Sequence, residues 1–330
     1  MRKKLLGYLG GFVGITVFLI FVKFSLGMSW GQVGSLLGTS LTAMTPLVLA
    51  AVGESLNEKA GTINIGLEGI FLITALMGVF GAELVGNWMG GLLFGVGVGA
   101  LIGFMFAVIC VYWRGDQIIA GLGLIMFGSG MVPFWLMAIW GQAGQYTPFG
   151  EELFVPQIST PLGSLSLLFF AAIGIAILAH FILHRTLIGV KIRAAGEKPE
   201  SADVAGISVN QLRLVVCVIG AALAGLGGAF MSLSWVHTVT KEMVAGYGFI
   251  ALACVVFAGL EPLETLIPAF LFGFGRALTP WANINPAVMN LFPGASYFIK
   301  MAPFILVLVA IAIVGRRLFP SAMGEPYVRE

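Results

Sequence analysis

The stretch LLGYLGGFVGITVFLIFV, residues 5–22, holds no charged residue and does not alternate between apolar and polar positions. A helix that crosses the hydrocarbon core of a membrane takes about 20 such residues, whereas a strand of a membrane barrel would show about 10 residues of alternating character. Similar runs recur along the chain, which is 59% hydrophobic and only 10% charged. We therefore predict an all-α polytopic membrane protein. Arg2, Lys3 and Lys4 precede the first run without a convincing cleavage site after it, so we interpret it as a retained span.

Ten membrane segments are predicted, and they form one membrane domain over residues 1–330. Three of the ten are shorter than a perpendicular span, so we expect them to be broken, tilted or re-entrant; they are 39–53, 247–260 and 265–280. The other seven are 5–22, 65–82, 91–113, 117–140, 164–184, 212–234 and 298–315.

The distribution of basic residues predicts the orientation. With the amino terminus inside, all of the 17 lysines and arginines lie on the inner side except Lys23, Lys241, Arg276 and Lys300. Because inner loops of membrane proteins carry an excess of such residues, we expect a multi-pass protein of the cell membrane with both termini in the cytoplasm. The loops 141–163 and 281–297 then face outward, with Trp235 near the outer interface as an anchor.

Composition argues against several classes of function. The net charge of +2 comes without a basic stripe, so no nucleic acid is expected as a partner. The three cysteines lie in apolar segments and are interpreted as small buried hydrophobes. His180 and His184 follow each other by one helical turn beside Arg185, which favours an interfacial position over a metal site. We predict no metal site, no catalytic residue and, since GxxxxGK[ST] is absent, no ATP hydrolysis by this chain.

Small residues recur at every fourth position in two segments. In lipid such ridges let helix backbones approach closely. They predict helix packing, either static or sliding during transport. The residues concerned are Gly91, Gly95, Gly99 and Gly103 in one segment and Gly220, Ala224 and Gly228 in the other.

One loop, about residues 185–211, is unlike the rest of the chain. It reads HRTLIGVKIRAAGEKPESADVAGISVNQLR over residues 184–213 and is rich in charge. Pro199 is suited to the first turn of a helix, and Glu200 and Asp203 would lie near the positive end of that helix. We predict an amphipathic helical hairpin on the inner face, which either docks on a soluble partner or merely sets topology.

This loop resembles the coupling loop of permease subunits in ATP-binding-cassette importers of simple sugars and nucleosides. The chain departs from that pattern at Lys198 and Ser201. The resemblance implies that the loop binds a separate ATPase. The matching residues are Arg193, Ala194, Gly196, Glu197, Pro199, Ala202, Ala205, Gly206 and Ile207.

A second stretch, AGTINIGLEGIFL at residues 60–72, is similar to the nucleoside-type branch of the same family. The resemblance implies a permease that moves nucleosides by alternating access and binds no cofactor itself, with ATP and Mg²⁺ on the ATPase. It also implies three kinds of protein partner: ATPase subunits, a second permease subunit that differs from this one, and an extracytoplasmic binding protein.

The polar segment GESLNEKAGTINIGLEG, residues 53–69, allows two placements. In one, Glu54, Glu58 and Lys59 lie at the inner end of a span, where one of the glutamates pairs with Lys59. In the other, the segment is a broken helix that lines the translocation path, since amides and carboxylates can exchange hydrogen bonds with nucleosides. The candidates for a path or gating role are Asn57, Asn64, Glu68 and, in a later span, Arg276.

Three alternatives stay open. A ribose or other simple-sugar importer belongs to the same transporter class. A secondary transporter or channel would work without ATP, although few intramembrane carboxylates suit a proton relay. A membrane-embedded enzyme is the third, and no nucleophile–base pair supports it.

Overall fold

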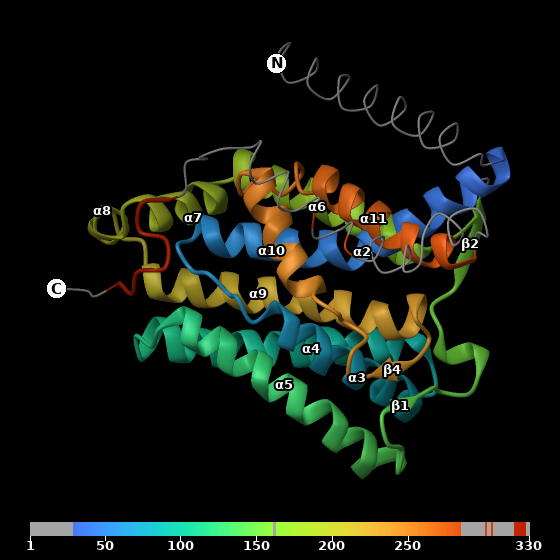
Figure 1. The fold of residues 1–330 in the computed structure, drawn as a ribbon. Helices are drawn as coiled ribbons and strands as arrows, with labels where there is room; N and C mark the ends of the chain where they lie inside the picture. The colour runs from blue at the N-terminus through green and yellow to red at the C-terminus, as the bar shows by residue number, and fades with distance from the viewer. Residues whose placement is uncertain (1–28, 161–162, 285–300, 302–304, 306–319, 328–330) are drawn as a thin grey trace.

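The computed structural model describes residues 29–160, 163–284, 301, 305 and 320–327. Most of these residues are helical, and four short strands lie in the segments between helices (Figure 1). The helices are α2 (Trp30–Lys59), α3 (Leu67–Val85), α4 (Trp88–Ala107), η1 (Val108–Tyr112), α5 (Gln117–Trp140), η2 (Glu151–Leu153), α6 (Leu167–Arg185), α7 (Leu187–Glu197), α8 (Pro199–Val204), α9 (Val209–Phe230), η3 (Met231–Trp235), α10 (Tyr247–Ala258) and α11 (Leu266–Ile284). The strands are β1 (Gln145–Tyr146), β2 (Gln157–Thr160), β3 (Gly163–Ser166) and β4 (Val239–Thr240).

Six helices among the described residues are long and apolar enough to cross a membrane: α2, α3, α4 with η1, α5, α6, and α9 with η3. The count of ten spans is not confirmed. The expected span 5–22 lies outside the described residues, as does 298–315 except for residues 301 and 305. The expected shortness of segment 247–260 is confirmed by α10, whose 12 residues rise about 18 Å, less than the hydrocarbon core of about 30 Å.

The expected shortness of segment 39–53 is wrong, because the segment lies within α2, a continuous helix of 30 residues. Ser29 caps it through a reciprocal pair of hydrogen bonds with Gln32, which starts the helix well before the apolar run. Within the helix, hydroxyl groups bond back to the backbone: Thr39 donates to the carbonyl of Ser35, and Ser55 to that of Ala51. Such residues lower the hydropathy without breaking the helix, so the apolar pattern underestimates its length.

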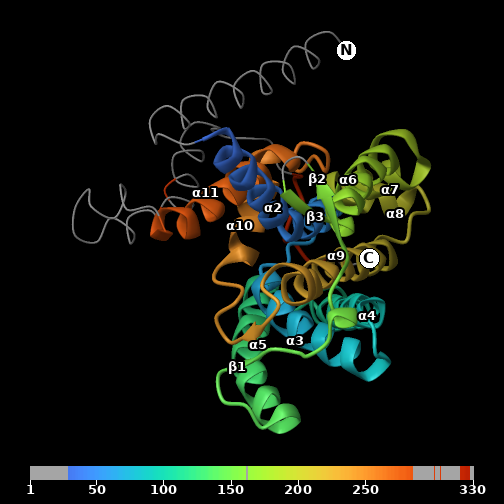
Figure 2. The same cartoon turned by 90° about the vertical axis from the view of Figure 1, so that its right-hand side faces the viewer.

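Helix α9 lies at the centre of the bundle and packs against α4, α2 and α3 (Figure 2). The predicted ridges supply these contacts. A Cβ added at Gly99 would lie 2.5 Å from the carbonyl oxygen of Ala221 and 2.9 Å from the Cα of Gly225. Gly95 and Gly103 on α4 make similar approaches to α9, whereas Gly91 approaches Gly78 on α3. Ala224 on α9 is fully buried. The other face of α9 meets α2 where Gly220 touches Gly53, and α3 where Gly228 touches Phe71 and Thr74.

The two ends of the bundle differ (Figure 1). One end carries α7, α8 and the described carboxyl-terminal residues, and we call it the α7–α8 end. The other carries the antiparallel pair β2–β3, with Thr160 opposite Gly163, and we call it the hairpin end. There the stacked rings of Trp140 and Tyr146 both donate hydrogen bonds to Glu83, which ties the segment after α5 to α3.

Candidate functional site

The predicted helical hairpin is present at the α7–α8 end. Helix α7 is capped by the hydroxyl of Thr186, and Pro199 occupies the first turn of α8. Gly206 ends the hairpin with φ +85°, a conformation that favours glycine. Every residue that the sequence assigned to coupling lies on α7, on α8 or in this turn: Arg193, Ala194, Gly196, Glu197, Pro199, Ala202 and Gly206.

The hairpin has one buried and one exposed face. On the buried side, Ala195 and Ala202 pack with Val209 at the start of α9. On the other side, Glu197 is exposed and apolar side chains also face outward: Leu187 is 80% exposed and Val204 is 92% exposed. Exposed apolar side chains of this kind are available to contact another protein or the lipid.

A buried arginine that the sequence analysis did not single out anchors this hairpin. Arg213 on α9 is 1% exposed and donates three hydrogen bonds to backbone carbonyls. Its Nε binds Ala60 after α2 at 2.9 Å, its Nη2 binds Ala195 on α7 at 3.3 Å, and its Nη1 binds Glu325 at 2.8 Å. A planar guanidinium can satisfy three acceptors at once. The sequence signal was an arginine near the start of α9, directly before a long apolar run.

The described carboxyl-terminal residues complete this junction. The amide of Ala322 donates to the carbonyl of Gly196 at 3.1 Å, and the amide of Gly324 donates to that of Gly61 at 3.1 Å. The hydroxyl of Ser321 binds the carbonyl of Glu197. We call residues 320–327 the strap. It joins the coupling hairpin to the turn between α2 and α3, so the three segments form one packed unit.

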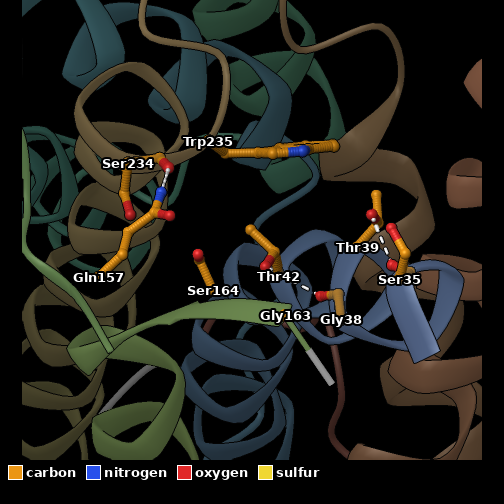
Figure 3. A pocket seen from close by; sticks show the side chains of 9 residues that line it. All are labelled: Ser35, Gly38, Thr39, Thr42, Gln157, Gly163, Ser164, Ser234 and Trp235. Atoms are coloured by element: carbon orange, nitrogen blue, oxygen red, sulfur yellow. Dashed lines mark hydrogen bonds between the residues drawn. The ribbon is translucent and has the colours of Figure 1, made fainter. Parts of the chain in front are cut away.

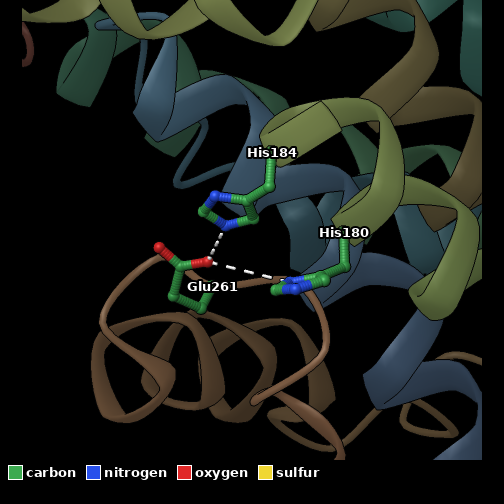
Figure 4. Close-up of side chains that lie close together, drawn as sticks. All are labelled: His180, His184 and Glu261. Atoms are coloured by element: carbon green, nitrogen blue, oxygen red, sulfur yellow. Dashed lines mark hydrogen bonds and ion pairs between the residues drawn. The ribbon is translucent and has the colours of Figure 1, made fainter. Parts of the chain in front are cut away.

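A second network lies beside the hairpin, around Glu261 in the turn between α10 and α11 (Figure 4). Its Oε1 binds the Nζ of Lys59 at 3.2 Å, and its Oε2 lies 2.6 Å from the Nε2 of His184. The other ring nitrogen of His184 faces the Nη1 of Arg193 at 3.3 Å. Arginine can only donate, so His184 accepts there and carries its proton on Nε2. The network connects α2, α6 and α7 to the α10–α11 turn.

Two expectations from the sequence concern residues of this network. Lys59 does not pair with Glu54 or Glu58, since both glutamates point into the bundle while Lys59 reaches Glu261. His180 also approaches Glu261, at 3.9 Å, and the ligand atoms of the two histidines and Glu261 lie within 4.8 Å of one another. That spacing could hold a metal ion. The positive charges of Lys59 and Arg193 oppose a cation there, and we interpret the cluster as an ion-pair network.

The neighbours of Glu261 determine its ionisation. Burial alone would raise the pKa of Glu261, but the hydrogen bond from His184 and the charge of Lys59 outweigh it and hold the pKa below its usual value. Glu261 is therefore ionised at neutral pH.

Three polar residues of segment 53–69, Glu54, Asn57 and Asn64, form a buried cluster between α2 and α3. Glu54 accepts hydrogen bonds from the side chain of Asn57 at 2.8 Å and from the backbone of Asn64 at 2.6 Å. The side chain of Asn64 binds the amide of Gly66 at 2.9 Å. Glycine at 220 makes room for Asn57, since a Cβ there would lie 2.7 Å from its Nδ2. These bonds hold the turn that receives Arg213 and the strap.

Glu68 and Arg276 belong to a different part of the bundle. The carboxylate of Glu68 accepts hydrogen bonds from the amides of Gly246 and Gly248, both at 2.7 Å, and so binds the amino end of α10. The guanidinium of Arg276 lies 4.7 Å from the ring centroid of Tyr247 at the same helix end. Together these contacts fix where the half-length helix α10 begins.

A polar cavity of about 170 Å³ lies at the hairpin end (Figure 3). The sequence did not predict this cavity, and it indicated only an interface anchor at Trp235. None of Asn57, Asn64, Glu68 and Arg276 lines it. It is formed by α2, the β2–β3 pair and η3, and its lining residues are Ser35, Gly38, Thr39, Thr42, Gln157, Gly163, Ser164, Ser234 and Trp235.

Comparison with known proteins agrees with this architecture. The family described as "Branched-chain amino acid transport system / permease component" matches residues 36–311. The chain is 33% identical over 309 residues to the guanosine ABC transporter permease protein NupQ of Bacillus subtilis, covering 88% of this chain and 95% of the relative. It is 30% identical over 311 residues to the nucleoside ABC transporter permease protein NupC of Lactococcus lactis, covering 86% and 94%. A putative glucose ABC transporter permease protein of Haloferax volcanii, TsgC13, is 33% identical over 331 residues, covering 89% and 98%. No solved structure matches the chain.

Proposed function

Because the chain belongs to the family of branched-chain amino acid transport system permease components, we propose that it forms part of the membrane pathway of an ATP-driven nucleoside importer. It is a multi-pass permease subunit and not an enzyme, since ATP hydrolysis in such transporters lies on a separate subunit. We propose that residues 1–330 form one membrane domain, that the chain binds no cofactor, and that ATP and Mg²⁺ bind to the partner ATPase.

The observation that carries the proposal is the α7–α8 hairpin, exposed on one face and bound on the other to α2, α9 and the strap. An ATPase bound to the exposed face moves the hairpin. Arg213 and Glu261 pass that movement to the helices, because their bonds reach α2, α9 and the α10–α11 turn. The energy comes from the different affinity of the ATPase for ATP in its two states.

This proposal fixes the orientation. The α7–α8 end lies in the cytoplasm, where the basic residues concentrate, and both termini lie on that side. The hairpin end faces outward and receives the extracytoplasmic binding protein. The cavity beneath Trp235 is then on the outer side of the bundle.

A second permease subunit of different sequence completes the pathway. Two of the organisms named above hold further relatives of this chain with the same substrate in their names, NupP in Bacillus subtilis at 23% identity and NupB in Lactococcus lactis at 24%. A pair of related but unequal permeases in each organism supports a heteromeric arrangement for this chain as well.

Nucleosides are the proposed cargo, on the strength of the relatives NupQ and NupC. A simple sugar is the second candidate, favoured by the likeness to a putative glucose permease. The test is uptake of labelled uridine or adenosine by cells that express the chain with its partner subunits, against an excess of unlabelled nucleoside or of ribose. We expect competition by the nucleoside and little by ribose; the reverse result would assign the chain to sugar transport.

The same assay tests the energy source. A variant of the partner ATPase that lacks its Walker lysine should abolish uptake, since that lysine binds the nucleotide phosphates. Uptake that persists with the inactive ATPase would make the chain a secondary transporter.

A further inference from the structure

The cavity at the hairpin end has walls from three separate parts of the chain (Figure 3). One face of α2 contributes Ser35, Thr39 and Thr42, at helical spacing. The β2–β3 pair brings Gln157, and η3 brings Ser234 and Trp235. In Figure 3 the indole ring lies across one side of the cavity, with the hydroxyl groups on the other. The arrangement sets one flat aromatic surface against a row of small polar groups.

Ser234 and Trp235 lie at the end of a π-helical turn, η3. Helix α9 ends at Phe230, and η3 continues it with wider turns, in which the amide of Val236 donates to the carbonyl of Met231 at 2.8 Å. Such turns are often found at functional sites, since they change the direction of side chains at the end of a helix. The ring of Tyr247 lies 5.2 Å from that of Trp235 and holds it in place.

The cavity mainly offers hydrogen-bond acceptors. Thr39 and Thr42 donate their hydroxyl protons to the carbonyls of Ser35 and Gly38, both at 3.0 Å, so their oxygen lone pairs remain for another donor. Gln157 donates from Nε2 to the carbonyl of Ser234, which leaves its own side-chain oxygen as an acceptor.

Ser234 provides an independent sign of a ligand. The residue is 1% exposed and lines the cavity, and its Oγ is buried with no hydrogen-bond partner among the described residues. A buried hydroxyl without a partner costs about 1–3 kcal/mol, so such groups in folded proteins call for an explanation. Because this oxygen is itself buried, a polar group of the cargo supplies the partner when the side chain turns toward the cavity.

The charge of the lining selects among ligands. None of the nine lining residues is charged. A phosphate group would lose its hydration there without gaining a positive partner, which is unfavourable. The chemistry therefore suits a neutral molecule with several hydroxyl or amino donors and one flat face, and excludes nucleotides.

We propose that this cavity is a binding station for the nucleoside on its way through the permease, in which Trp235 packs on the base while Thr39, Thr42 and Ser234 bind donors of the sugar or base. The assignment rests on the proposed function. The volume of the cavity, about 170 Å³, is below the range of about 300–1,000 Å³ for pockets that enclose a whole ligand. The station therefore holds only part of the cargo, and binds loosely, as a transport path requires.

The test uses the complete transporter in proteoliposomes, with its ATPase, second permease and binding protein, and measures ATP-dependent uptake of labelled uridine. Trp235→Ala should lower the rate at subsaturating uridine about tenfold, since stacking on an aromatic ring is worth about 1–3 kcal/mol per base. Trp235→Phe, which keeps an aromatic ring, should recover most of the rate. The binding protein is the same throughout, so the difference arises in the permease.

A matched pair of threonines separates ligand contact from helix stability. Thr42→Val should lower the uridine rate about threefold, because a neutral hydrogen bond contributes about 0.5–1.5 kcal/mol. Thr45→Val is the control: its hydroxyl bonds back to Leu41 at 3.0 Å in the same way, but it does not line the cavity. Equal effects of the two substitutions would overturn the assignment.

A direct probe locates the ligand. Photoactivated 8-azidoadenosine should label the peptides that contain Thr39, Thr42 or Trp235, and excess uridine should prevent that labelling. If the wild-type transporter takes up no nucleoside, the proposed function fails. If it takes up nucleosides but the label and the variants leave the cavity unaffected, the binding station alone is wrong.

Discussion

Arg213 donates a hydrogen bond from Nη1 to the backbone carbonyl of Glu325, 2.8 Å away, although 112 residues separate them along the chain. The same guanidinium holds Ala60 and Ala195. The coupling hairpin is thus bound through one side chain to two membrane helices and to the strap, and any displacement of α7 must move or break these bonds.

Arg213→Lys should uncouple ATP hydrolysis from transport. A lysine keeps the charge but cannot reach three carbonyls in three directions. Losing one buried bond to a charged group costs about 1.5–3 kcal/mol, and we expect nucleoside uptake to fall by about tenfold or more while the reconstituted complex still hydrolyses ATP. Arg185→Lys, at an exposed position on α6, should leave both rates unchanged. Uptake and hydrolysis that fall in parallel would argue for a merely structural role.

Glu197→Arg should prevent the ATPase from binding. Glu197 is exposed on the hairpin, and the substitution reverses its charge at the proposed docking face without disturbing packing. Surface changes of this kind usually alter stability by less than about 0.5 kcal/mol. The measurement is copurification of the ATPase with the permease, with Glu151→Arg at the hairpin end as the control. Normal copurification of the Glu197 variant would place the docking surface elsewhere.

Gly196 is a poorer site for such a test. A Cβ at this position would collide with the carbonyl oxygen of Lys59, so a substitution there should disturb the junction between α7 and α2. Loss of transport in a Gly196 variant would then report on folding as well as on docking.

Gly99→Ala should destabilise the bundle, and Gly97→Ala should not. The added methyl group at position 99 would press on the backbone of α9, whereas a Cβ at position 97 meets nothing within 4 Å among the described residues. Overpacking of this kind costs about 1–3 kcal/mol, while alanine for glycine in an open helix position gains about 0.5–1 kcal/mol. Thermal unfolding of the two purified variants in detergent provides the comparison. A Gly99 variant as stable as the wild type would show that α4 and α9 can separate without loss.

The ion-pair network should weaken in acid. Because the pKa of Glu261 is lowered in the folded protein, its contribution to stability is complete above the ordinary glutamate pKa of about 4.3. It is lost as the pH falls through the lower folded value. We expect the difference in melting temperature between wild type and Glu261→Gln to be constant near neutral pH and to shrink below about pH 4. Lys59, His180, His184 and Arg193 are the charged or titratable groups that surround it. A difference that does not change with pH would show that the carboxylate charge contributes nothing.

The amino-acid sequence by itself determined the features that depend on neighbouring residues. The apolar composition indicates a helical membrane protein, since the bilayer admits only closed backbone hydrogen bonding. Pro199 and the charges around it predict the two short helices at the α7–α8 end, because helix starts are set within one turn. The motif at residues 193–207 indicates the family for the same reason: its residues are contiguous.

Only the tertiary structure decided which distant groups meet. In the sequence Arg213 is one of several inner-side arginines, and only the fold places three backbone carbonyls around it. Lys59 pairs with Glu261, 202 residues away, and not with a glutamate of its own helix. The length of α2 was missed because hydropathy counts a threonine hydroxyl as polar even when it bonds back to its own helix. The cavity beneath Trp235 follows from neither composition nor spacing. It forms because α2, the β2–β3 pair and the π-helical turn η3 meet at one end of the bundle. The packing free energy that joins these elements depends on contacts between distant segments, so no single segment predicts it.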